Sequence, residues 1–319
     1  MALSIVRFKN ENADIQWGVL SNGKVAVLST AFATTAELIQ QGYATIAEMA
    51  SAAKQLIPLE KLNLLSPITS PSQVLCQGAN FRQHMIDSGM DPDAKSFNMF
   101  FTKSVASITG PQGEIIKPKH VELLDYEIEL TLVLGKATDR EVQVTNENLH
   151  EYVAGICIGN DISARDVQIP QMQFHKGKSY RTFCPLGPVL CLLAKDEMKY
   201  LSQMNLTLSV NGQTRQQDSS GNLVFKPAET LTEYSTITNF AVGDVLMTGT
   251  PAGCALGLPS STVVRVSGLL PEQLKWNLFK KGQAKRSAYL NVGDVVESHI
   301  VSSDGKIDLG YQRHTVVSA

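Results

Sequence analysis

The chain has 319 residues and a mass of 34.7 kDa, a length that predicts two unequal domains or one domain with an appendage. Its 28 Lys and Arg residues nearly balance its 30 Asp and Glu residues, which argues against a protein held to nucleic acid by overall charge. No apolar run approaches the roughly 20 residues of a membrane helix. The start shows no secretory signal, and five scattered cysteines predict reduced thiols in a cytoplasmic protein.

Residues 1–70 are predicted to form a small N-terminal α+β domain. Three short apolar runs in the first 30 residues predict strands, and Asn22-Gly23 predicts a two-residue hairpin turn. Apolar residues at helical spacing predict helices over 35–42 and 46–57. Prolines with Ser and Thr between them predict a connector over 58–72, which ends this domain.

Residues 71–319 are predicted to form a mostly β domain. Short β-branched runs bounded by Gly, Pro, Asn or Asp predict strands over 73–80, 127–135, 153–161, 187–194, 206–216, 244–250, 294–300 and 307–317. Helical patterns are fewer, at 81–90, 146–152 and 271–281. Many strands with few helices between them favour an antiparallel barrel, roll or sandwich over a doubly wound α/β fold.

The strand predicted over 127–135 carries two acidic residues on one face. Its period of two places Glu127 and Glu129 together, while Ile128 and the leucines that follow it face the other way. Two carboxylates side by side in a strand fit for burial repel each other, and a divalent cation would remove that repulsion. The alternative is an exposed edge strand whose glutamates face water, and spacing alone leaves both interpretations open.

The strand predicted over 153–161 ends in a third carboxylate, Asp161. Gly155, Cys157 and Gly159 share its face, and such small side chains predict space for a ligand above the strand. Three carboxylates together with water or substrate oxygens are typical ligands of Mg²⁺ or Mn²⁺.

Two cationic residues and an amide follow Asp161 in the chain. Arg165, Gln168 and Lys178 are predicted to recognise an anionic, oxygen-rich substrate, because Arg pairs with carboxylates and Lys places a compact charge near an enolate. Residue type alone favours the alternative that these are surface or salt-bridge residues.

Four motifs in this order resemble the catalytic domain of the fumarylacetoacetate hydrolase family. They are YEIEL at 126–130, NDISARDVQ at 160–168, GKSYRTFCPLGP at 177–188 and GDVLMTGTPAG at 243–253. The resemblance implies a β-roll or barrel catalytic domain, usually dimeric, that holds Mg²⁺ or Mn²⁺.

The resemblance also implies roles for individual residues. It implies that the metal ligands are Glu127, Glu129 and Asp161, the same three that the strand argument selects. It implies that the substrate or its developing charge is contacted by Arg165, Gln168, Lys178 and Thr250.

The family has a lid with the pattern G-x-N-Y-x-x-H-x-x-E, which matches residues 78–87. His84 aligns with the general base that deprotonates a water, and Asp87 with the acid that orients it. Phe81 replaces the tyrosine and Asp87 the glutamate of the pattern. The alternative makes His84 an exposed histidine without a catalytic role. Lys103 matches a family lysine near the site mouth, although a surface ion pair explains it nearly as well.

Residues 255–289 form a longer connection than the family usually has there. Pro271 suits the start of a helix. The apolar face of this helix is predicted at Leu270, Leu274, Leu278 and Phe279. We favour a dimer-interface or solvated excursion over a cover for the substrate mouth, and an insertion without a role is a third alternative.

The sequence as a whole predicts a divalent-metal-dependent hydrolase that cleaves a C–C bond in an acylpyruvate- or fumarylpyruvate-type 2,4-dioxo acid. In this prediction His84 with Asp87 activates water, and Lys178 helps the ion to stabilise the leaving enolate. Two alternatives stay open: an isomerase or decarboxylase of a 2-oxo or 2-hydroxy-dienoic acid that acts through a metal-bound enolate, and a non-catalytic binding member.

The predicted partners are a small 2-oxo acid substrate and a second copy of this chain in a homodimer. We expect the protein to bind neither nucleic acid nor a membrane. The resemblance suggests a setting in the catabolism of aromatic compounds or sugar acids.

Overall fold

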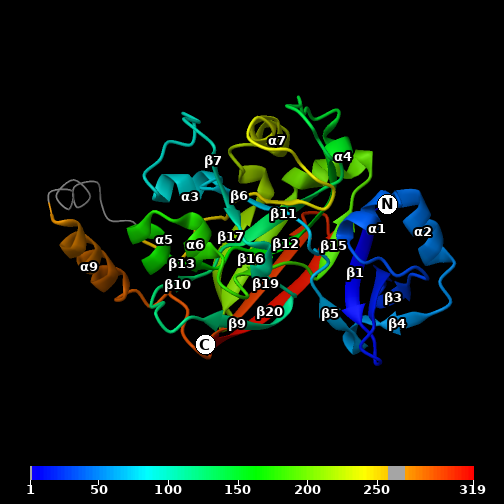
Figure 1. Ribbon diagram of the computed structural model, residues 1–319, viewed down its shortest axis with the longest axis horizontal. Coiled ribbons are helices and arrows are strands. Elements are labelled where there is room, and N and C mark those ends of the chain that lie inside the picture. The colour runs from blue at the N-terminus through cyan, green and yellow to red at the C-terminus, as the bar shows by residue number, and fades with distance from the viewer. Residues whose placement is uncertain (1, 258–269) are drawn as a thin grey trace.

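The computed structural model describes residues 2–257 and 270–319. The chain forms a strand-rich α+β fold built on two large sheets, with helices along the rim (Figure 1), which confirms the predicted fold class. Among the described residues, none of the helices combines the length and apolar character needed to cross a bilayer.

The larger sheet has at its centre the strand that directly follows Glu127 and contains Glu129. In spatial order its strands are β4 (Leu56–Pro58), β3 (Lys24–Val27), β2 (Ile15–Ser21), β1 (Leu3–Lys9), β15 (Val189–Leu192), β12 (Val153–Asn160), β11 (Ile128–Leu134), β18 (Val245–Met247), β6 (Val74–Gly78) and β7 (Met99–Lys103), with β5 (Asn63–Leu65) on β1. Because β1 pairs with β15, the N-terminal strands extend the same sheet. The domain boundary at residue 70 stays a prediction.

The second large sheet and two short ribbons complete the β structure. The second sheet runs β17 (Gln213–Ser219), β16 (Met204–Val210), β19 (Val295–Ser302), β20 (Asp308–Ser318) and β9 (Gln112–Lys117); the ribbons pair β10 (Leu124–Asp125) with β13 (Ser163–Ala164) and β8 (Ile108–Thr109) with β14 (Cys184–Pro185). The predicted hairpin turn is confirmed at Asn22-Gly23, where both residues have positive φ, 49° and 72°.

The helices of the described residues are short. They are α1 (Thr35–Gln40), α2 (Tyr43–Ser51), α3 (Arg82–Asp87), α4 (Leu149–Tyr152), α5 (Arg165–Gln171), α6 (Phe174–Lys178), α7 (Pro227–Ser235) and α9 (Glu272–Gln283), with 3₁₀ turns at η1 (Leu59–Lys61), η2 (Val105–Ser107), η3 (Lys195–Ser202) and η4 (Ser220–Asn222). The sequence analysis missed α5, α6 and α7. It was also wrong in extending the second helix to residue 57, where β4 forms, and in leaving 58–72 without structure, where η1 and β5 form.

The small residues of β12 do not leave space for a ligand, so that prediction was wrong. A Cβ at Gly159 would lie 2.8 Å from Met247 Cε on β18, and one at Gly155 would collide with the carbonyl oxygen of Cys191. These glycines instead let neighbouring strands approach closely. The three predicted metal ligands therefore lie where β11 begins and β12 ends, and not on the face of small residues.

Helix α9 lies at one end of the molecule (Figure 1). Pro271 directly precedes its first helical residue, Glu272, so the helix starts one residue later than the sequence predicted. Leu274 and Leu278 on its predicted apolar face are 46% and 52% exposed, whereas Phe279 packs against the core. Residues 258–269 of the predicted insertion lie outside the described residues.

Candidate metal centre and active site

Three carboxylates converge at the junction of β11 and β12. Glu127 precedes β11, Glu129 lies within it, and Asp161 follows β12. One oxygen of each lies within 4.8 Å of the others, and all three residues are buried. Since β11 lies between β12 and β18, the alternative of an exposed edge strand is excluded.

Cationic side chains enclose these carboxylates. Lys178 Nζ donates to Glu127 Oε2 at 2.7 Å and to Asp161 Oδ2 at 2.5 Å. Arg165 Nη2 pairs with Glu127 Oε1, and Lys103 Nζ pairs with Asp161 Oδ1. The Arg165 and Lys178 side chains are 4% and 3% exposed, so they are not surface residues. The salt-bridge half of the alternative interpretation is confirmed, because both side chains form ion pairs with buried carboxylates.

Gln168 and Lys103 are also buried. Gln168 Oε1 accepts a hydrogen bond from Arg165 Nη1 at 2.8 Å, so the amide lies against the guanidinium, and a substrate contact for either residue stays a prediction. The Lys103 side chain is fully buried, which excludes the surface ion pair. Its ammonium pairs with Asp161 and lies 3.4 Å from the Ile162 carbonyl oxygen. A substrate contact for Lys103 stays a prediction.

Glu129 differs from its two neighbours because no ion pair reaches it in the described part of the chain. Its Oε2 accepts a hydrogen bond from the Gly249 N–H at 2.8 Å. Burial, and then repulsion from Asp161 and Glu127, raises the pKa of Glu129 well above its usual value. Burial also opposes ionisation of Glu127, but Arg165 and Lys178 outweigh it and lower the pKa of that carboxyl.

The charges of this cluster fit a divalent cation. Four buried carboxyl groups of this cluster face its three buried cations in the described residues, so one negative charge is uncompensated when Glu129 is ionised; the carboxyl groups are Asp125, Glu127, Glu129 and Asp161, and the cations Lys103, Arg165 and Lys178. Carboxylate oxygens are the ligands that hard cations such as Mg²⁺ and Mn²⁺ prefer. The three carboxylates therefore offer ligands of the type that the predicted ion needs. All four oxygens of Glu127 and Asp161 are paired with cations in this structure, so binding of an ion requires that Lys178 moves from between these two carboxylates.

The turn after β18 fixes Glu129 from one side. Gly249 has a φ of 94°, and a Cβ there would lie 2.9 Å from the Cβ of Asn80, so the turn requires glycine. The next residue, Thr250, donates its hydroxyl proton to the Ile128 carbonyl at 2.9 Å. Because that proton is committed to the backbone, the hydroxyl has none to donate to a substrate, and a substrate contact for Thr250 stays a prediction.

The predicted acid/base pair on α3 is not joined by a hydrogen bond in the described residues. Asp87 is exposed and accepts a hydrogen bond from Gln83 Nε2 at 2.8 Å. Burial lowers the pKa of His84, and Glu127 and Arg165 are among the charges that act on it. The imidazole thus lies within electrostatic reach of the carboxylate cluster. The catalytic roles of His84 and Asp87 stay predictions.

Two residues at the site were missed by the sequence analysis. Asp125 accepts a hydrogen bond from Arg165 Nε at 2.8 Å, and Cys254 Sγ lies 3.8 Å from Glu127 Oε1. The alternation that places Glu127 and Glu129 on one face also reaches back to Asp125, so this signal was present in the sequence. Nothing comparable marks Cys254, whose place depends on the fold.

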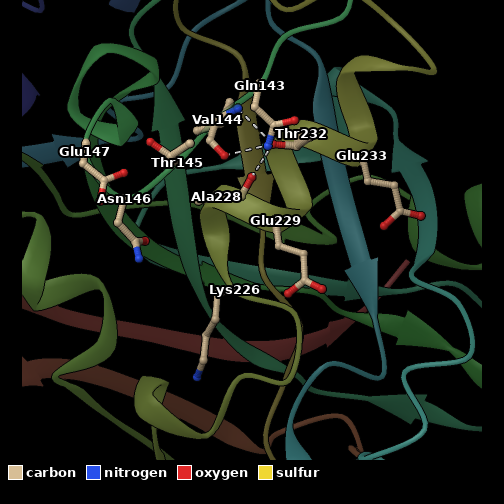
Figure 2. A pocket seen from close by; sticks show the side chains of 10 residues that line it. All are labelled: Gln143, Val144, Thr145, Asn146, Glu147, Lys226, Ala228, Glu229, Thr232 and Glu233. Carbon is tan, nitrogen blue, oxygen red and sulfur yellow. Dashed lines mark hydrogen bonds between the residues drawn. The ribbon is translucent and has the colours of Figure 1, made fainter.

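A separate hollow of about 590 Å³ lies between α7 and the loop before α4 (Figure 2). It is lined by Gln143, Val144, Thr145, Asn146, Glu147, Lys226, Ala228, Glu229, Thr232 and Glu233, and none of these belongs to the carboxylate cluster. Thr232 Oγ1 donates to the carbonyls of Ala228 and Val144 and accepts from the Val144 N–H. The Thr232 hydroxyl therefore has a structural role, because it joins the loop before α4 to α7.

Residues 73–317 match the family model described as fumarylacetoacetate (FAA) hydrolase C-terminal. The chain belongs to the fumarylacetoacetate hydrolase family. The resemblance stated from the four motifs is thus confirmed, and the strands that carry the carboxylate cluster, β11 and β12, lie within the matched region.

Three members of the fumarylacetoacetate hydrolase family that are at least 30% identical to this chain are named as tautomerases or as a probable isomerase. The oxaloacetate tautomerase YisK of Bacillus subtilis is 37% identical over 211 residues, 65% of this chain and 68% of that protein. The human mitochondrial oxaloacetate tautomerase FAHD2A is 33% identical over 225 residues, 69% of each chain. The crystal structure of a probable 2-hydroxyhepta-2,4-diene-1,7-dioate isomerase from Mycobacterium abscessus aligns with a TM-score of 0.74 and 30% identity, over 100% of this chain and 99% of that one. These relatives are bacterial and mitochondrial, and the cytoplasmic location and the homodimer stay predictions.

Proposed function

We propose that this protein is a keto–enol tautomerase of a short 2-oxo acid, with oxaloacetate as the first substrate to test. This is the isomerase alternative of the sequence analysis, and it replaces C–C hydrolysis as our leading interpretation. Two relatives over 30% identical, both named oxaloacetate tautomerases, support it. The structural observation that carries it is a half-buried His84 near the buried ion pairs, without the contact to Asp87 that an oriented, attacking water would require.

Tautomerisation needs a base at one carbon and positive charge at one oxygen. Towards the enol, a proton leaves C3 of the 2-oxo acid for the base as negative charge develops on the 2-oxygen, and that oxygen then takes a proton from solvent. No water attacks a carbonyl carbon, and the reverse sequence returns the keto form. Because burial lowers the pKa of His84, its imidazole is neutral near pH 7 and accepts that proton. Lys178 supplies a fixed positive charge in a buried site, where such a charge acts most strongly.

Other residues of this chain orient the substrate and hold the ion. Arg165 and Gln168, which contact each other, bind the substrate carboxylate through donors fixed in direction. A Mg²⁺ or Mn²⁺ ion would be held by Glu127, Glu129 and Asp161. When bound, the ion supplies Lewis-acid stabilisation of negative charge on the substrate.

The proposal is tested by following proton exchange and water incorporation separately. In D₂O with Mg²⁺, the protein should accelerate both the decay of the enol absorbance of oxaloacetate and deuterium entry at C3, observed by NMR. Incubation of acetylpyruvate in H₂¹⁸O should yield no labelled acetate. Labelled acetate together with an unaccelerated enol decay would identify a hydrolase instead.

His84→Ala should lower turnover by about 10²- to 10⁴-fold, the usual effect of losing a general base. In the wild type, kcat/KM should fall as the pH drops through the pKa of His84, because the protonated ring cannot accept a proton. Burial lowers that pKa, so the midpoint of the acid limb should lie below 6.5. His299→Ala, on β19, is the matched control and should leave the pH–rate profile unchanged. An unaltered acid limb in His84→Ala would show that another group is the base.

A further inference from the structure

Asp125, at the end of β10, is fully buried and serves as a shared acceptor. Its oxygens accept hydrogen bonds from Arg165 Nε at 2.8 Å and from the backbone N–H groups of Tyr126 at 2.8 Å, Ala255 at 2.7 Å and Leu256 at 3.0 Å. One carboxylate thus joins a substrate-binding guanidinium to the first residues of the long 255–289 segment.

The hydrogen bond to Asp125 determines where the rest of Arg165 points. The guanidinium is planar and rigid, so fixing Nε also fixes the directions of both terminal nitrogens. One of these donates to Gln168 Oε1 at 2.8 Å, and the other pairs with Glu127. Without Asp125, Arg165 could rotate about its side chain and lose this orientation.

Residues 255–257, which include two of the donors to Asp125, are also hydrogen-bonded to residues at and just after the end of α9. Arg286 Nε donates to the Ala255 carbonyl at 2.9 Å. The Gln283 amide donates to the Gly257 carbonyl at 2.5 Å and accepts from the Gly257 N–H at 3.2 Å. The two ends of the 255–289 segment are therefore clamped together directly beside Asp125.

We propose that Asp125 is a positioning residue that orients Arg165 for the substrate carboxylate and couples the base of α9 to the site. The inference rests on the proposed function, because it takes Arg165 to bind the substrate. A displacement of residues 255–257 then changes substrate affinity through Asp125, although among the described residues no hydrogen bond or ion pair joins α9 to the carboxylate cluster. The 255–289 segment would then affect substrate affinity, a role that its length alone did not indicate.

The test is a double-mutant cycle with oxalate as the probe, on the full-length, Mg²⁺-saturated protein. Oxalate offers the adjacent oxygens of a 2-oxo acid but has no C3 proton, so its affinity is measured without turnover. Asp125→Asn and Arg165→Gln should each raise the calorimetric Kd at least about ten-fold. In the Arg165→Gln background, Asp125→Asn should add less than about two-fold. Equal effects in both backgrounds, or an unchanged Kd for Asp125→Asn alone, would overturn the proposal.

Asp166→Asn is the matched control for loss of a buried carboxylate. Asp166 directly follows Arg165 in the chain, but its Oδ2 accepts the Glu122 N–H at 2.7 Å, and no hydrogen bond or ion pair of the described residues joins its carboxylate to the Arg165 guanidinium. This variant should lose stability while keeping the oxalate affinity of the wild type. An equal loss of affinity in Asp166→Asn would mean that Asp125 acts only through general destabilisation.

A surface substitution keeps the coupling testable even where Asp125→Asn fails to fold. Arg286→Ala should speed hydrogen exchange at Ala255 and raise the oxalate Kd about two- to five-fold, whereas its exposed neighbour Lys285→Ala should do neither. Faster exchange without a change in Kd would overturn the coupling. If the wild type shows no tautomerase activity while the oxalate Kd values still fit the double-mutant cycle, the proposed function is refuted and the positioning role of Asp125 stands.

Discussion

Glu129→Gln should abolish ion-dependent turnover and leave the ion-free protein at least as stable as the wild type. Glu129 has no ion-pair partner in the described residues, and glutamine keeps an oxygen for the Gly249 N–H. Because the pKa of Glu129 is raised in the folded state, this group costs the folded protein stability as the pH rises above its unfolded pKa, and the cost vanishes in acid. The variant lacks this cost at every pH. Activity with Mg²⁺ should fall at least about 100-fold, because losing a metal ligand lowers activity more than losing a residue that only supports a ligand.

Glu127→Gln is the matched comparison and should have the opposite effect on stability. Glu127 forms ion pairs with Lys178 and Arg165, so its loss leaves each of these two buried cations with one carboxylate partner fewer. Breaking a buried ion pair in this way costs about 3–5 kcal/mol. Urea unfolding of both variants without added metal gives the comparison. Equal destabilisation by both substitutions would contradict the assigned charges, and normal turnover in either would contradict the assigned ligands.

Lys178→Met should lower turnover by about 10²- to 10³-fold while raising the affinity for a divalent ion. The ammonium is the buried positive charge available to the developing oxyanion, and losing one such group typically costs that much in kcat. The same ammonium repels a cation held by Glu127 and Asp161. At the separations within this cluster, its removal should tighten Mn²⁺ binding at least about ten-fold.

Lys176→Met controls for the loss of a lysine from α6. Lys176 is exposed and donates to Gln171 Oε1 at 2.7 Å, so this substitution should change neither turnover nor ion affinity. Steady-state kinetics and Mn²⁺ calorimetry on both variants give the answer. Weaker Mn²⁺ binding in Lys178→Met, or turnover close to that of the wild type, would mean that Lys178 supports the fold rather than the reaction.

The sequence predicted the three carboxylates because their placement depends on local geometry. The period of two along β11 puts Glu127 and Glu129 on one face, and Asp161 ends the neighbouring strand. Their partners depend on tertiary structure. The chain must fold before Lys103, at the end of the edge strand β7, reaches Asp161, and no local pattern encodes that contact.

The errors of the sequence analysis have the same origin. The glycines of β12 were interpreted as room for a ligand, but cross-strand neighbours fill that space. Helices α5 and α6 are too short to show an apolar period, and their buried polar residues face the site instead of a core. The contact expected from the spacing of His84 and Asp87 on α3 is absent among the described residues, because Gln83 takes the carboxylate.

The most direct test of the carboxylate site is a calorimetric titration of metal-stripped protein with Mn²⁺, for the wild type and Glu129→Gln in parallel. We expect one ion per chain in the wild type and an affinity at least about 100-fold lower in the variant. The same Mn²⁺ affinity in both proteins, or no binding to either at millimolar concentrations, would contradict the assignment of Glu127, Glu129 and Asp161 as an ion site.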